Sequence, residues 1–199
     1  NKLTNLLGVN CASIGTLGVD HNSIKNNNRL TTPESEVIIS SLNSLYYKNV
    51  KNIIIEASSH GLHQYRLEGI HFNIVVITTL SRDHLDYHKT FKDYKIAKLK
   101  LFSDASNKGV AIINECVPQY KDFIEAAKRN NLKIITIGNS LSANWKYKIK
   151  NININEQEVE VTFDNIKTTI FTNLIGKYQI NNLVTAISIL MEMGFKRDR

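Results

Sequence analysis

Unbroken runs of apolar residues alternate along most of the chain with segments whose apolar positions repeat at helical spacing. The unbroken runs are typical of buried strands, which we expect at residues 11–17, 52–56, 72–78, 109–113 and 133–137. We expect helices from Pro33 to about Lys48, with Thr32 as the cap, and at residues 91–103 and 117–130. This alternation predicts an α/β fold with a doubly wound, mostly parallel sheet.

The pattern changes after Gly138, where apolar and polar residues alternate with a period of two. Short turns separate three such segments, at residues 147–154, 159–163 and 168–171. They predict an antiparallel β-meander attached to one edge of the main sheet. A last helix is expected at residues 176–193, before Gly194. We interpret residues 1–199 as one domain.

The composition is that of an ordinary globular protein, with 42% hydrophobic and 22% charged residues. No apolar run approaches the roughly 18 residues of a membrane-spanning helix, so no membrane partner is expected. The 25 basic and 18 acidic residues leave a net charge of +7, which fits either solvated lysines or a small polyanion such as a nucleotide. We find no nucleic-acid recognition unit. Two widely separated cysteines and no signal peptide indicate the cytoplasm.

Polar residues that suit catalysis follow several of the expected strands. Glu56 ends one strand, the loop after the next contains His84, and Asn114 follows a third. The carboxyl ends of the strands are where open α/β sheets bind ligands, so we expect Glu56 and His84 to share a divalent cation. The alternative is that Glu56 caps the next helix and His84 packs in a turn. His88 lies four residues after His84, which suits zinc on a helix, but a loop expected at residues 82–87 favours a structural role.

Lys98 lies on the apolar stripe of its helix, four residues after Tyr94 and three before Leu101. A lysine on a buried face has a lowered pKa, which favours the neutral amine that reacts with carbon dioxide. The alternative is a lysine whose stem packs while its ammonium reaches water. The other lysines of this helix fall off the stripe and are expected in solvent: Lys92, Lys95 and Lys100.

Three stretches, residues 56–66, 80–88 and 94–98, resemble the Mur ligases, and among them the MurE type. The resemblance covers nearly the whole chain and is most specific at residues 31–114. It implies an enzyme of peptidoglycan synthesis that uses ATP and Mg²⁺. Such enzymes phosphorylate a carboxylate of UDP-N-acetylmuramoyl-L-alanyl-D-glutamate, and a diamino acid attacks the resulting acyl phosphate. The diamino acid is meso-diaminopimelate or L-lysine, and we expect the former because it is common among bacteria with this ligase type.

The resemblance also implies roles for individual residues. The positions that match substrate contacts are Thr31, Thr32, Ser58, Gln64 and Arg66. The positions that match the magnesium site and the catalytic groups are Glu56, His84 and Lys98, the last of which is carbamylated in the family. Nucleotide contacts are implied for Asn114 and Asn182.

The chain also departs from the family pattern. The family's glycine-rich phosphate loop, its uridine-binding domain and its amino-acid-binding domain have no counterpart in these residues, so we expect a central-domain fragment that is inactive alone. Thr79 and Gln179 stand where asparagines are usual, and Cys116–Val117 replaces an acidic pair. Two alternatives remain at this point: an inactive truncated domain that retains part of a substrate site, or another amide ligase of the Mur and folylpolyglutamate synthetase superfamily.

Overall fold

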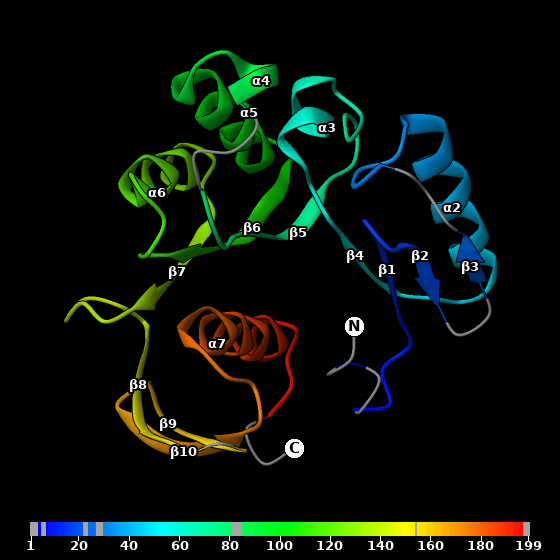
Figure 1. The fold of residues 1–199 in the computed structure, drawn as a ribbon. Helices are drawn as coiled ribbons and strands as arrows, with labels where there is room; N and C mark the ends of the chain where they lie inside the picture. The colour runs from blue at the N-terminus through cyan, green and yellow to red at the C-terminus, as the bar shows by residue number, and fades with distance from the viewer. Residues whose placement is uncertain are drawn as a thin grey trace. The chain divides into compact units, whose positions relative to one another are not determined.

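The computed structural model describes residues 4, 7–21, 24–26, 30–80, 85–153 and 155–196. Contacts within the chain form two compact units (Figure 1). The first unit comprises Asn1–His71 and His84–Asp104, and the second comprises Phe72–Asp83 and Ala105–Arg199. The sequence predicts one domain.

The first unit contains a four-stranded sheet in the order β3-β2-β1-β4. Strands β1 (Cys11–Gly15) and β4 (Asn52–Ile55) are parallel, as predicted. Strands β2 (Gly18–His21) and β3 (Ile24–Asn26) add antiparallel pairs that the sequence did not predict. They are too short to show a period-two pattern. The buried core of this sheet consists of Ala12, Ile14, Val19, Leu45 and Val50.

The described residues of the first unit include the helices α2 (Ser35–Tyr47), α3 (Ser59–His63), α4 (Leu85–His88) and α5 (Phe91–Ser103). The predicted bounds of α5 are confirmed. The N-cap residue of α2 is Glu34, which makes no side-chain capping bond, so the prediction that Thr32 caps this helix is wrong. The loop expected at residues 82–87 is also wrong from Leu85 onward, where α4 begins, while residues 81–84 lie outside the described part.

The second unit contains a six-stranded sheet in the order β10-β9-β8-β7-β6-β5. Its parallel part is formed by β5 (Phe72–Ile77), β6 (Ala105–Asn114), β7 (Lys133–Gly138) and the start of β8 (Trp145–Ile152). Strands β8, β9 (Gln157–Phe163) and β10 (Ile166–Thr172) form the predicted antiparallel meander at its edge. The fold class is therefore confirmed, with the parallel strands distributed over two sheets.

The described part of the second unit also contains the helices α6 (Tyr120–Arg129) and α7 (Lys177–Glu192). Helix α7 packs against β6, β7 and β8 (Figure 1). The buried side chains between α7 and the sheet include Ile180, Val184, Ile112 and Trp145. The ring of Trp145 stacks on Phe163 with centroids 4.2 Å apart. The meander is thus fixed to the parallel part through a shared core.

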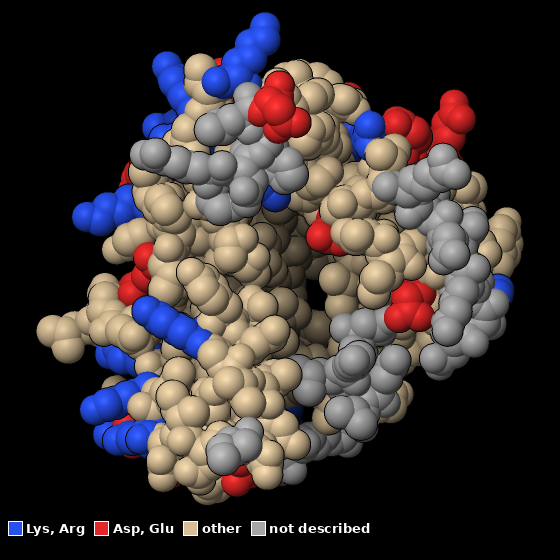
Figure 2. Space-filling view, in the orientation of Figure 1, with Lys and Arg blue, Asp and Glu red and all other residues tan. Residues whose placement is uncertain are grey.

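The described helices include none that is long and apolar enough to cross a membrane. Basic side chains project from the meander region of the face shown in Figure 2. Lys150 and Lys167 on the meander lie 3.4 and 3.7 Å from the carboxylate of Glu160. Part of the basic surplus is therefore a solvated face that carries its own counter-charge.

Candidate functional site

Glu56 directly follows β4, and its carboxylate is held by the loop that follows β1. Oε2 of Glu56 accepts hydrogen bonds from the backbone N of Thr16, at 2.9 Å, and from Thr16 Oγ1, at 2.8 Å. A Cβ atom on Gly15 would lie 2.7 Å from the same oxygen, so only glycine lets the carboxylate rest on the strand end. Glu56 does not cap α3, because the cap is Ser58, whose Oγ accepts from Gly61 N at 3.1 Å.

Thr31 and Thr32 lie against this carboxyl edge of the first sheet. Thr32 is buried, and its hydroxyl donates to the backbone oxygen of Glu56, at 2.6 Å, and accepts from Ser58 N, at 2.8 Å. Oγ1 of Thr31 lies 3.1 Å from Oγ1 of Thr16. A Cβ on Gly61 would lie 2.7 Å from Thr32 Cβ and Cγ2. The structure therefore brings both threonines together with Glu56 and Ser58.

Arg66 extends the cluster on the side of Thr32. Its Nη1 donates to the backbone oxygen of Thr32, at 2.7 Å, and its Nη2 donates to Gln64 Oε1 and pairs with Glu34 Oε1, at 3.0 Å. Its Nε is buried and makes no hydrogen bond to the described residues. Nε2 of Gln64 donates to the hydroxyl of Tyr87, at 2.9 Å. Gln64 and Arg66 thus belong to the same network as the threonines.

Lys98 approaches the same edge from helix α5. Its Nζ donates to the backbone oxygen of Ala57, at 2.9 Å. Burial lowers the pKa of Lys98, and the neighbouring Glu56 charge opposes part of that shift. Lys92 is exposed as predicted, but Lys95 and Lys100 are half-buried, so that expectation is wrong for these two. The Nζ of Lys100 lies 3.7 Å from the ring centroid of Tyr65, a cation–π contact that helps to keep it on the protein.

The remaining predicted site residues do not belong to this described cluster. His84 lies outside the described residues, and with it the predicted approach to Glu56. Asn114 ends β6 in the second unit, where Oδ1 accepts from Cys116 N at 2.9 Å and Nδ2 is buried without a hydrogen-bond partner among the described residues. Asn182 is exposed on α7 of the same unit. The described residues contain no group of three histidine, cysteine or acidic side chains placed to hold a metal ion.

His88 is buried among aromatic rings. Its ring centroid lies 5.5 Å from that of His60, 5.7 Å from that of His63 and 5.4 Å from that of Tyr94. This packing supports the structural role that we favoured for His88 over zinc binding.

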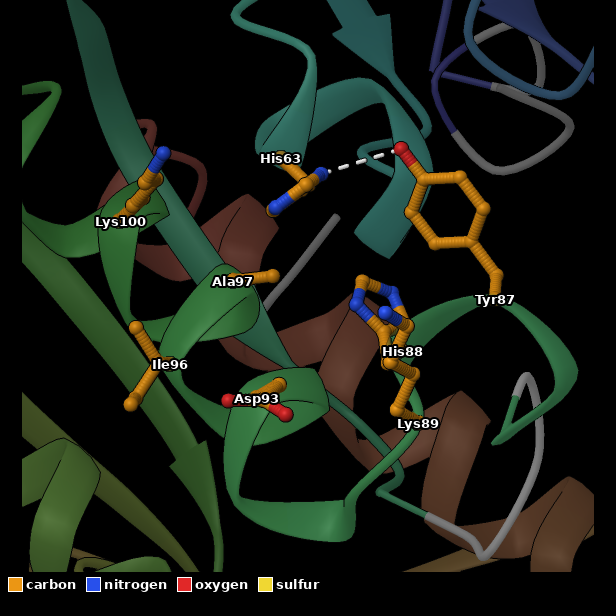
Figure 3. Close-up of a pocket in the computed structure, with 8 residues that line it drawn as sticks. All are labelled: His63, Tyr87, His88, Lys89, Asp93, Ile96, Ala97 and Lys100. Carbon is orange, nitrogen blue, oxygen red and sulfur yellow. Dashed lines mark hydrogen bonds between the residues drawn. The ribbon is translucent and has the colours of Figure 1, made fainter.

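The sequence analysis missed Tyr87, whose hydroxyl borders a pocket of about 340 Å³ in the first unit (Figure 3). Nδ1 of His63 lies 3.0 Å from this hydroxyl. The Tyr87 hydroxyl therefore lies between the side chains of Gln64 and His63. The sequence feature that could have identified Tyr87 is its position within residues 80–88, one of the stretches that resemble the Mur ligases. The residues that line the pocket are His63, Tyr87, His88, Lys89, Asp93, Ile96, Ala97 and Lys100.

A second carboxylate, in the second unit, repeats the Glu56 arrangement. Glu115 follows β6, and its carboxylate accepts from Ser140 Oγ, at 2.6 Å, and Ser140 N, at 3.2 Å. A Cβ on Gly138, at the end of β7, would clash with Oε2 of Glu115. In both units, a glycine that ends a strand makes room for a carboxylate, and the next hydroxyl residues hold it.

Comparisons with known proteins identify the family of the chain. The family profile described as the Mur ligase middle domain matches residues 2–190. Over 198 residues the chain is 35% identical to the UDP-N-acetylmuramoyl-L-alanyl-D-glutamate–2,6-diaminopimelate ligase of Rickettsia rickettsii, covering 97% of this chain and 41% of that protein. The ligase of the same name from Agrobacterium fabrum is 34% identical over 184 residues, with 92% and 37% covered.

A solved structure of a ligase with this name superimposes with a TM-score of 0.87 at 27% identity, over 98% of this chain and 40% of that one. These similarities confirm the resemblance to the MurE type. The chain spans about 40% of the length of the relatives it matches. The profile match and the shared fold together establish that the chain belongs to the Mur ligase middle-domain family.

Proposed function

We propose that this chain is the central part of a longer ATP-dependent ligase, called the whole ligase below. The enzyme joins meso-diaminopimelate to UDP-N-acetylmuramoyl-L-alanyl-D-glutamate through an acyl phosphate. The observation that carries the proposal is the cluster around Glu56. All five residues that match substrate contacts of the family belong to this one hydrogen-bonded cluster of the first unit: Thr31, Thr32, Ser58, Gln64 and Arg66.

The cluster suits an anionic, polar substrate. Arg66 is the cationic member, and its buried Nε offers a donor that the described residues leave unused. A guanidinium pairs with carboxylate or phosphate through two parallel hydrogen bonds. Thr31 carries a hydroxyl at the surface of the cluster. Thr32 has a different part, because its hydroxyl is buried and fixes the backbone from Glu56 to Ser58. We therefore assign to Thr32 the positioning of this backbone segment, residues 56–58.

The residues present also fit magnesium. Glu56 is exposed and presents a carboxylate, and hard cations prefer oxygen ligands. An ammonium cannot serve as a ligand, but the lowered pKa of Lys98 enlarges its neutral amine fraction. The amine adds to carbon dioxide to give a carbamate and release one proton. Glu56, carbamylated Lys98 and His84 would then hold Mg²⁺, which when bound offsets negative charge on the reacting phosphates.

The other substrates are assigned to other parts of the enzyme. Asn114 and Asn182 of the second unit are the proposed contacts to ATP, and the buried Nδ2 of Asn114 supplies an unused donor. Because the chain spans about 40% of its relatives' length, the phosphate loop and the sites for uridine and the diamino acid are assigned to the rest of the whole ligase. We propose a cytoplasmic location, since the substrates of this family are cytoplasmic metabolites.

The test is a product assay with the purified whole ligase. Phosphate release from ATP should require Mg²⁺, the muramoyl dipeptide and a diamino acid together, and mass spectrometry should detect the tripeptide product. Glu56→Gln should reduce turnover at least about a hundredfold, because it removes the charge that faces the cation. No product with either meso-diaminopimelate or L-lysine would refute the proposed function. Product with L-lysine alone would correct the diamino acid.

A further inference from the structure

Thr16 is the only described residue that donates hydrogen bonds to the Glu56 carboxylate, and it does so twice. Its hydroxyl also lies 3.1 Å from the hydroxyl of Thr31. We infer that Thr16 is a positioning residue that couples substrate binding at Thr31 to the cation-holding carboxylate of Glu56. This inference rests on the proposed function, which assigns the substrate to Thr31 and the cation to Glu56.

The Thr16 hydroxyl serves two acceptors. It donates to Glu56 Oε2, at 2.8 Å, and to Thr31 Oγ1, at 3.1 Å. A hydroxyl has a single proton, so these two oxygens share it. Glu56 and Thr31 therefore compete for the Thr16 proton.

The Glu56 carboxylate is also restricted in its orientation. The backbone N of Thr16 donates to the same Oε2, and Gly15 lets this oxygen approach the end of β1. Two donors on one oxygen leave Oε1 as the atom that faces outward from this contact. Hydrogen bonds to charged groups are among the stronger ones in proteins, and neighbouring bonds polarise one another. A change at Thr31 therefore reaches the carboxylate through a single intervening hydroxyl.

Substrate binding at Thr31 changes how this proton is shared. A substrate group that hydrogen-bonds to Thr31 Oγ1 displaces the Thr16 proton from it, and the Thr16 hydroxyl then donates to Glu56 alone. The affinity for the cation in the presence of substrate consequently differs from that in its absence. Because coupling of this kind is reciprocal, the cation changes the substrate affinity by the same factor.

The test measures Mn²⁺ binding to the whole ligase by electron paramagnetic resonance, with and without the muramoyl dipeptide. In the wild type, the dipeptide should change the Mn²⁺ dissociation constant by about fivefold or more. Thr16→Val keeps the shape and the backbone N–H but lacks the hydroxyl, so this ratio should fall to about one. Thr16→Ser keeps the hydroxyl and should retain the wild-type ratio. Thr168→Val, an exposed threonine on β10, is the matched control.

A second variant keeps the inference testable if Thr16→Val does not fold. Thr31→Val removes the Thr16–Thr31 bond permanently, so its Mn²⁺ dissociation constant without dipeptide should already lie near the wild-type value measured with dipeptide, and the dipeptide should change it no further. A wild-type ratio of one would overturn the inference, and so would an unchanged ratio in folded Thr16→Val or Thr31→Val. If the wild-type enzyme still forms product, the proposed function stands in either case. Absence of turnover in the wild type would instead refute the proposed function.

Discussion

The Nζ atom of Lys98, on helix α5, lies 2.9 Å from the backbone oxygen of Ala57, the residue that follows Glu56. This contact places the amine of one element beside the strand-end carboxylate of another. Burial lowers the pKa of Lys98, while the charge of Glu56 acts in the opposite direction. Since burial is the larger effect, the amine loses its proton at a lower pH than an exposed lysine does.

The first prediction concerns the protonation of Lys98. Acetylation of the amine as a function of pH should give a midpoint for Lys98 below that of exposed Lys92, measured peptide by peptide by mass spectrometry. The lowered pKa also makes the stability depend on pH. Just below pH 10.5 the unfolded chain, in which Lys98 has its ordinary pKa, binds more protons than the folded chain does. The free energy of unfolding therefore gains a contribution from Lys98 as the pH rises toward 10.5. Equal midpoints for the two lysines would contradict the burial effect.

The second prediction concerns Tyr87, whose hydroxyl accepts from Gln64 and lies 3.0 Å from Nδ1 of His63. Tyr87→Phe leaves the Gln64 amide without this partner and frees its orientation. A lost hydrogen bond of this kind corresponds to about 1 kcal/mol, so KM for the muramoyl dipeptide should rise roughly fivefold while kcat changes less. Tyr65→Phe is the matched control, because its ring keeps the contact with Lys100. An unchanged KM in Tyr87→Phe would show that Gln64 does not need the tyrosine.

The third prediction uses the close packing of Gly61 on Thr32. Alanine is favoured over glycine inside a helix by about 1 kcal/mol. Gly61→Ala should nevertheless lower the thermal midpoint, because its Cβ would meet Thr32 Cβ and Cγ2 at 2.7 Å. Adding Thr32→Ser removes Cγ2 but keeps the hydroxyl, and should recover part of the loss. A midpoint for Gly61→Ala at or above the wild-type value would mean that this contact is not tight.

The sequence predicted the strands that carry the site, because long apolar runs bounded by polar residues have few other structures available to them. It missed β2, which begins at Gly18, and β3, because both strands are short. It also assigned Thr32 to the cap of α2, since a threonine before Pro33-Glu34 is a common helix start. The structure instead uses that hydroxyl to hold the backbone at Glu56 and Ser58, a contact between distant segments that no local pattern contains.

The same limit applies to the candidate site. The strand-end rule located Glu56 and Asn114 without any contact information. It did not identify Thr16 or Ser140, which hold carboxylates 40 and 25 residues away along the chain. The local signal, a glycine followed by hydroxyl residues after an apolar strand, is present at Gly15-Thr16 and near Gly138. It is too short to be recognised without the partner carboxylate.

Replacement of Lys98 in the whole ligase tests most directly whether this cluster is the catalytic centre of an ATP-dependent ligase. Lys98→Ala should remove most of the phosphate release that depends on the muramoyl dipeptide. A small added carboxylate, such as acetate, should restore part of it by supplying the anionic group that the carbamate provides. Lys95→Ala, in the same helix, should retain activity. Full activity in Lys98→Ala, together with loss of activity in Lys95→Ala, would contradict the assignment of Lys98 and with it this description of the site.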